Sequence, residues 1–184
     1  METTRTTTTT SASTTPGMVT GMFRDRESAE RAYNALAARG YSKEEINVVM
    51  SDDTRNKHFA HSTTETELGS KAMEGAGVGS AIGGTLGAIT GALVAIGTSI
   101  AIPGLGLVVA GPLAAAFAGA GAGGLTGGLL GGLVGSGIPE EHAKVYESGI
   151  KEGGIVVGVK PRNVEDADYV ANEWKTYRGE NIYR

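Results

Sequence analysis

Few residues of this chain have the types and spacing that proteins use for chemistry. It has no cysteine, which excludes thiol catalysis, cysteine-based zinc sites and disulfides. His58 and His61 are three residues apart, with Asp52, Asp53 and Glu65 nearby, and imidazole and carboxylate groups are ligands for divalent metals. Nothing in the spacing fixes a third ligand, and histidines in so polar a segment usually face solvent. We therefore predict no metal site, and whether His58 and His61 bind a metal is left open.

Two other patterns invite comparison with catalytic or cofactor motifs. Residues Gly119–Gly124 have the G-x-G-x-x-G spacing of a dinucleotide-binding turn, but they follow no predicted strand, and no acidic residue lies about twenty positions further on. His142 stands beside Glu140 and Glu141 at the start of a predicted helix, where a surface position is expected. No nucleophile–base pair and no P-loop lysine is present. We predict a protein that is not an enzyme and has no cofactor and no small-molecule substrate.

Charge and glycine content restrict the function further. The chain has 16 basic and 20 acidic residues and a net charge of −4, the wrong sign for neutralising nucleic-acid phosphates. Glycine contributes 30 of the 184 residues, more than twice the usual share of roughly 7%. Of these glycines, 21 lie in residues 75–139, a segment without one charged side chain. We therefore predict no nucleic-acid partner and a packing role for this uncharged segment.

Glycines recur at every fourth position in two runs of the uncharged segment. The ten positions are Gly75, Gly79, Gly83, Gly87, Gly91, Gly119, Gly123, Gly127, Gly131 and Gly135. Steps of four place small residues in one stripe along a helix, where two backbones can approach closely. We predict that these glycines are helix-packing positions of a glycine-zipper hairpin. Its two helices would span 75–102 and 107–137, with a turn at Pro103, Gly104 and Gly106. Pro112 would either begin the second helix at its first turn or kink a helix that starts near Leu105.

Bulky apolar side chains accompany both stripes, so neither predicted helix has a polar side. Ten glycines forgo on the order of 10 kcal/mol of helix propensity, and close packing, lipid or both must compensate. The predicted helices are roughly 42 and 46 Å long, more than the about 30 Å of a bilayer core. A membrane hairpin therefore fits. Against it, glycine and alanine supply little transfer free energy, and the flanks show no excess of basic residues.

The flanking segments have ordinary globular patterns. Residues 1–17 form a Thr/Ser-rich tail that is predicted to be disordered, and residues 51–74 form a polar linker. Residues 18–50 and 140–184 alternate strand and helix patterns. We predict strands at 18–23, 46–50, 155–159 and 181–183, and helices at 27–39, at 140–152 and between Asn163 and Gly179.

The order of these elements predicts an α+β fold, a ferredoxin-like βαβ…αβα(β) domain interrupted by a long glycine-zipper helical hairpin at 75–139. Strands 18–23 and 46–50 alone would make a two-stranded ribbon, which is marginal in water. The strand at 155–159 must therefore complete the sheet, and both ends of the insert must lie close together. A hairpin allows this, whereas a single membrane pass would separate the two halves of one core.

Several of these segments resemble a known family. They are Val19–Asp25, Glu27–Ala32, Gly40–Ser42, Ile46–Met50, Gly137–Glu147 and Gly153–Val159. Together they resemble the bacterial general-stress or heat-induced stress protein family, whose small α/β domain often carries a glycine-zipper insert. The resemblance covers about residues 18–178. It implies stress-related expression and a cytoplasmic or membrane-peripheral location, and it supplies no catalytic residues.

These observations favour a non-enzymatic structural protein of the stress response. In the first hypothesis, glycine-zipper hairpins inserted in or lying against a membrane make the chain self-associate, with the α/β domain on the cytoplasmic side of the inner membrane. In the alternative, the hairpins form the apolar inner layer of a soluble, closed homo-oligomer or particle. A small-ligand-binding ferredoxin-like module is a second alternative. The expected partners are further copies of the chain and, in the first hypothesis, membrane lipid.

Overall fold

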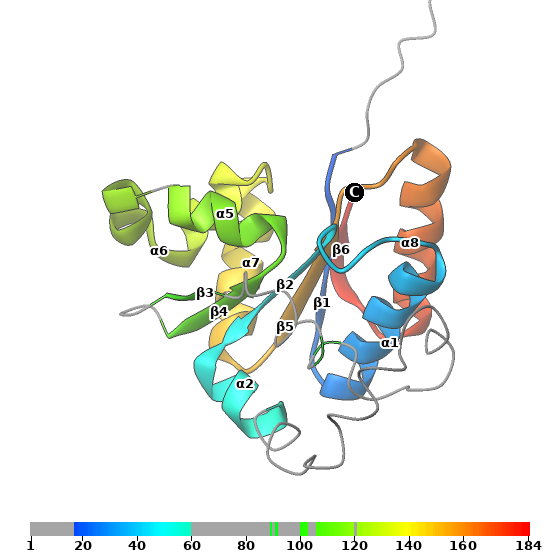
Figure 1. The fold of residues 1–184 in the computed structure, drawn as a ribbon, viewed down its shortest axis with the longest axis horizontal. Coiled ribbons are helices and arrows are strands. Elements are labelled where there is room, and N and C mark those ends of the chain that lie inside the picture. Colours follow the sequence, from blue (N-terminus) through cyan, green and yellow to red (C-terminus); the bar gives the residue numbers. More distant parts are fainter. Residues whose placement is uncertain (1–16, 60–88, 90, 92–99, 103–105, 120) are drawn as a thin grey trace, which may run out of the picture.

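A six-stranded antiparallel sheet with helices on both faces forms the centre of the protein (Figure 1). The structure, a computed structural model, describes residues 17–59, 89, 91, 100–102, 106–119 and 121–184. The predicted α+β class is confirmed. The strands are β1 (Val19–Phe23), β2 (Ile46–Ser51), β3 (Ile100–Ile102), β4 (Leu107–Ala110), β5 (Ile155–Val159) and β6 (Glu180–Tyr183). The described helices are α1 (Arg26–Ala38), α2 (Asp52–His58), α5 (Pro112–Gly119), α6 (Gly121–Gly135), α7 (Glu140–Lys151) and α8 (Val164–Thr176).

The strand from the C-terminal segment joins the two N-terminal strands. The sheet order is β3-β4-β2-β5-β1-β6, and all neighbours are antiparallel. Val159 of β5 lies opposite Val19 of β1 on one side and opposite Ile46 of β2 on the other. Every residue of β5 is buried, as expected for a central strand covered on both faces. The prediction that residues 155–159 complete the sheet across the insertion is confirmed.

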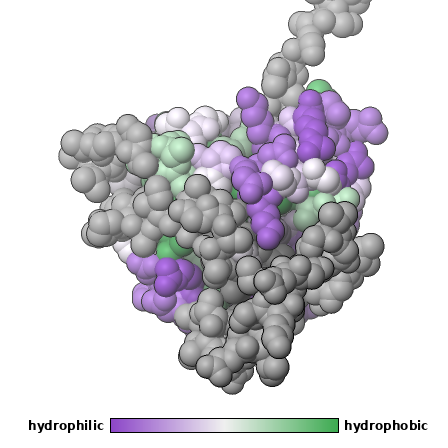
Figure 2. Space-filling view, in the orientation of Figure 1, coloured by the Kyte–Doolittle hydropathy of each residue, from purple (hydrophilic) through white to green (hydrophobic). Residues whose placement is uncertain are grey.

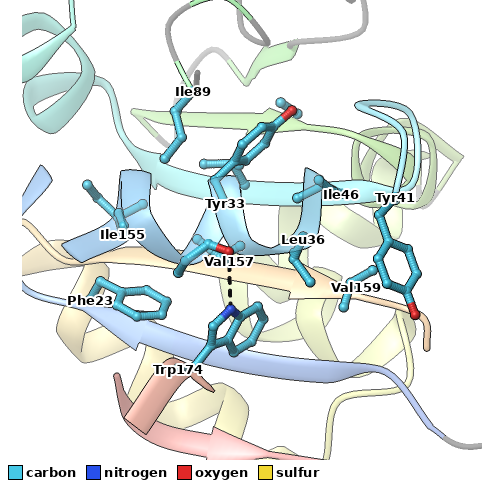
Figure 3. Packing of buried hydrophobic residues seen from close by; sticks show 14 of the residues in the cluster. Phe23, Tyr33, Leu36, Tyr41, Ile46, Ile89, Ile155, Val157, Val159 and Trp174 are labelled. Carbon is cyan, nitrogen blue, oxygen red and sulfur yellow. Dashed lines mark hydrogen bonds between the residues drawn. The ribbon is translucent and has the colours of Figure 1, made fainter. Parts of the chain in front are cut away.

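Helices α1 and α8 cover one face of the sheet and enclose the larger core (Figures 1 and 3). Helix α8 begins directly after Asn163, as predicted, and α1 begins one residue before its predicted start. The side chains of Asp25 and Asn163 cap these helices by accepting backbone N–H bonds from the first turns. Trp174 of α8 is fully buried; its ring meets Phe23 edge-on and its indole N–H donates to the Ala32 carbonyl. Gly21 on β1 leaves the room that this ring occupies.

Helices α5, α6 and α7 cover the opposite face. Successive strand residues alternate between the two cores: Val48 faces α1 and α8, and its neighbour Val49 packs with Leu113 of α5 and Leu133 of α6. Tyr146 of α7 is buried there and bonds with Thr20 of β1, the two hydroxyl oxygens being 2.9 Å apart. The second half of the glycine-rich insert is thus part of the domain's own core.

The predicted helical hairpin over 75–139 is wrong at Ile100–Ile102 and Leu107–Ala110, which are the strands β3 and β4. These segments are rich in β-branched residues, which favour strands. In addition, β2 has an edge that β5 does not occupy, and β4 pairs with it from Val48 opposite Ala110 to Ser51 opposite Leu107. Sheet hydrogen bonds outweigh helix formation here.

The predicted linker 51–74 is wrong at its start, because Asp52–His58 form helix α2. Ser51 caps this helix by accepting the Thr54 N–H, and two aspartates lie in its first turn and basic residues in its last. That charge order matches the helix dipole and stabilises a short polar helix. The remainder of the linker, residues 60–74, and the tail at 1–16 lie outside the described residues.

Asn47 links the insert to the sheet. Its side chain is buried, its amide oxygen accepts the Leu113 N–H at 2.7 Å, and its amide nitrogen donates to the Gly158 carbonyl at 3.3 Å. One residue of β2 therefore holds both the first turn of α5 and the central strand β5. Its removal would leave two buried backbone groups without these partners.

We predict that Asn47→Ala lowers the free energy of unfolding by about 2–3 kcal/mol, because it removes the side-chain hydrogen bonds to the buried Leu113 N–H and the Gly158 carbonyl. Urea denaturation followed by circular dichroism measures the change. The matched control is Asn172→Ala on the exposed side of α8, which should stay within about 0.5 kcal/mol of the unaltered chain. Equal effects of the two substitutions would contradict the role of Asn47.

Candidate functional site

The glycine-rich insert is the most unusual feature of the sequence, and the structure describes most of its second half, residues 106–119 and 121–139. Gly111 turns the chain from β4 into α5 with a φ of +87°, and a Cβ there would collide with the Ile46 carbonyl of β2. Glycine is required by both the left-handed backbone and the close approach. Pro112 then occupies the first helical position, where its missing N–H costs nothing. The insert is thereby seated against β2.

Helices α5 and α6 pack through a glycine that the four-residue repeat does not include. A Cβ at Gly132 would overlap the ring of Phe117, so this glycine makes room for the aromatic ring between the two helices. Gly128 has non-helical angles, φ 58° and ψ −152°, and divides α6 into two pieces. The predicted helix over 107–137 is therefore wrong at Leu107–Ala110, which form β4, and it is divided at Gly128, but a helix does begin at Pro112, one of the two predicted roles of this proline.

Three of the ten repeat glycines have described surroundings, Gly91, Gly131 and Gly135, and none of them packs against another part of the chain. Gly131 and Gly135 are exposed, and nothing lies within 4 Å of a Cβ built at either position or at Gly91. Gly119, Gly123 and Gly127 belong to α5 and α6. Gly75, Gly79, Gly83 and Gly87 lie outside the described residues. Zipper packing by the ten glycines stays a prediction, and any partner of Gly131 and Gly135 would come from elsewhere.

The turn residues of the predicted hairpin fall between strands. Gly106 is exposed and has a φ of +60°, and it immediately precedes β4. Pro103 and Gly104 lie outside the described residues. Because Ile102 is opposite Leu107 in the sheet, the chain reverses direction between β3 and β4. The reversal occurs in a β-hairpin and not between two helices.

The first half of the insert touches the other side of the sheet at Ile89. This side chain is fully buried in the core under α1, near Tyr33 (Figure 3), and its N–H donates to the Glu30 carboxylate at 2.9 Å. Glu30 is itself fully buried, and the Arg26 guanidinium lies 3.7 Å from its other oxygen. At Ile89 the insert therefore contacts the α1 face, whereas α5 and α6 contact the opposite face. The prediction that the two halves pair as a hairpin is wrong at these residues.

The residues of α5 and α6 whose exposure is described and which face solvent are small or apolar. Ala115 and Ala116 of α5 are exposed, and so is Val134 of α6 with 41% of its surface accessible. Together with the exposed Gly131 and Gly135 they form a charge-free surface, which we call the α5–α6 surface. In Figure 2, white and green residues lie around α5, whereas the surface over α8 is mainly purple.

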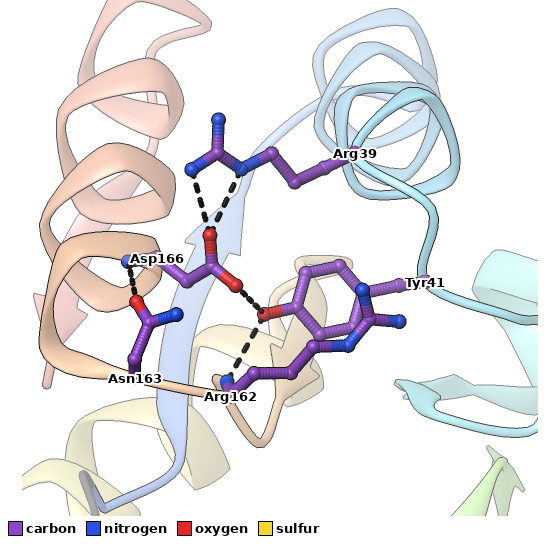
Figure 4. A network of polar contacts seen from close by, with 5 residues as sticks. All are labelled: Arg39, Tyr41, Arg162, Asn163 and Asp166. Atoms are coloured by element: carbon purple, nitrogen blue, oxygen red, sulfur yellow. Dashed lines mark hydrogen bonds and ion pairs between the residues drawn. The ribbon is translucent and has the colours of Figure 1, made fainter.

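A polar cluster joins the end of α1 to the start of α8 (Figure 4). The Arg39 guanidinium donates twice to one oxygen of Asp166, at 2.9 and 2.7 Å, and the Tyr41 hydroxyl donates to the other at 3.0 Å. The hydrogen bonds from Arg39 hold the pKa of Asp166 below its ordinary value. Burial raises the pKa of Tyr41. Asp166 thus stays charged and Tyr41 neutral, which suits a structural ion pair and not an acid–base site.

The histidines do not form a metal site in the part of the chain that is described, where no group of three or more histidine, aspartate or glutamate side chains is suitably placed. His58 ends α2, and its backbone carbonyl accepts a bond from Arg26; His61 lies outside the described residues. His142 lies on α7, partly exposed, with its ring 4.7 Å from that of Tyr183.

A shallow depression beside α7 could accept a small molecule. It is lined by residues that include Arg24, Lys144, Ser148 and Glu152, and it is open to solvent. Both cations are already paired, Arg24 with Glu152 and Lys144 with Glu140, each at 2.7 Å. No nucleophile is placed beside a base, so this depression has no catalytic arrangement.

Sequence reasoning missed the polar residues that hold the insert in place, Glu30 and Asn47. Both are buried in the structure. The predicted apolar face of the helix is formed by Ala29, Ala32, Tyr33 and Leu36 and does not include Glu30. A buried polar residue needs a specific partner, but the partners, Ile89 and Leu113, are 59 and 66 residues away in the sequence.

Comparison with known proteins gives no match: no family model, no curated protein and no solved structure matches this chain. The resemblance to the general-stress family therefore stays a prediction. Among the helices of the described residues, none has the length and apolar character needed to cross a membrane.

We predict that Asp166→Asn lowers the free energy of unfolding by about 2 kcal/mol at pH 7, since the charged hydrogen bonds from Arg39 are lost. The depressed pKa of Asp166 contributes stability above its unfolded value of about 3.9, and this is lost as the pH falls through the folded pKa. The gap between the variant and the unaltered chain should therefore narrow below roughly pH 4. Denaturation from pH 2 to 7 measures it, with Glu44→Gln as the control, because Glu44 is exposed and lies outside the helices. A gap that is constant with pH would contradict this role.

We predict that Ile89→Ala lowers the free energy of unfolding by about 2–4 kcal/mol, because it empties a fully buried site under α1. Val134→Ala, on the exposed α5–α6 surface, should cost less than about 1 kcal/mol. Chemical denaturation of both variants provides the comparison. If both substitutions cost the same small amount, the insert is not docked on α1 at Ile89.

Proposed function

We propose that this protein is a non-enzymatic structural protein that self-associates through its glycine-rich insert. The observation that carries the proposal is the α5–α6 surface. Its residues are exposed, it contains no charge, and its repeat glycines Gly131 and Gly135 have free space around them. An uncharged surface of small residues allows two backbones to approach closely.

The seating of the insert favours a homo-oligomer in water as the form of assembly. The bulky side chains of α5 and α6, such as Leu113, Phe117, Leu129 and Leu133, are buried against the sheet and α7. The described residues that α5 and α6 leave exposed, Ala115, Ala116, Gly131, Val134 and Gly135 among them, have small side chains, which favours contact with water or with another copy over contact with lipid. Burial of the α5–α6 surface between copies then removes the remaining apolar area from water.

We further propose that β1, α1, β2, β5, α8 and β6 constitute a ferredoxin-like module. The order β2-β5-β1-β6 and the antiparallel pairing of every neighbour support this. Among the described residues, the segment between β2 and β5 adds β3 and β4 beyond β2, and α5, α6 and α7 on the second face. In this proposal the module is a scaffold that presents the insert, because its polar cluster and its open depression are occupied by internal ion pairs.

Membrane association is the second candidate, and one observation favours it. The 65 residues from 75 to 139 contain no charged side chain, and a segment of that length could contact lipid. A role in the stress response and a place in the cytoplasm rest on the family resemblance, and the lack of cysteine suits a reducing compartment.

We predict that Gly131→Glu combined with Gly135→Glu dissociates the assembly while the protomer stays folded. Both positions are exposed with free space around them, so the new side chains fit the protomer but place charge in the contact. Light scattering on a sizing column gives the mass, and circular dichroism reports folding. Asn172→Glu on α8 is the control and should leave the mass unchanged.

Three outcomes would count against the proposal or redirect it. A monomeric mass for the unaltered chain in detergent-free buffer would contradict self-association. An unchanged mass for the double variant would show that copies meet elsewhere. Recovery of the unaltered chain only with membranes, in a form that resists carbonate extraction, would favour the lipid-bound alternative over the water-exposed assembly.

A further inference from the structure

We draw no further inference here: the strongest candidate, the buried side-chain cluster of Glu30 and Tyr33 beside Ile89 on the α1 face of the sheet, carries nothing because the residues on both sides of Ile89 in the sequence, 88 and 90, lie outside the described part of the chain and nothing in the structure shows what covers the cluster.

Discussion

The placement of β5 between β1 and β2 is the constraint on which the rest of the structure depends. Neither N-terminal strand contacts the other, so the sheet exists only when a strand from more than one hundred residues later fills the gap. The intervening insert must consequently start and finish at the same domain. Its start is fixed by β2 and α2, and its end by α7, which leads directly into β5. Insert and sheet therefore fold as one unit.

The same constraint explains how a glycine-rich, charge-free segment is accommodated. The chain does not close on itself as two paired rods at the described residues; it divides around the outer edge of the sheet. Ile89 is held under α1 by Glu30, β3 and β4 extend the sheet, and α5 and α6 complete the opposite face with α7. One buried polar anchor, Asn47, lies on the sheet, and the other, Glu30, lies on α1. The described bulky side chains, such as Leu113 and Leu133, face inward, whereas Gly131 and Gly135 are exposed.

The elements that could be predicted from the sequence are those with a strong local pattern. Strands β1, β2 and β5 and helices α1, α7 and α8 follow from apolar periodicity and from the caps Asp25 and Asn163. Helix α2 has a capping serine and a favourable charge order. It was not predicted, because it contains no apolar residues that could show a helical periodicity. Strands β3 and β4 could not be distinguished from helix inside a glycine repeat, because their formation depends on the free edge of β2. Burial of Glu30 depends on a contact 59 residues away, which no local pattern contains.

The division of the insert around the sheet can be measured directly, because the chain has no native cysteine. Spin labels placed at Gly91→Cys and Val134→Cys, both at positions with side-chain space or exposure, report the distance between the two halves, with unlabelled protein added to dilute contacts between copies. If the two halves lie on opposite faces of the sheet, the sheet and the packing distance of about 10 Å on each side of it separate the labels by more than about 20 Å. Helices paired as a zipper hairpin would instead bring the two halves to roughly 10 Å, and that short distance would contradict the fold described above.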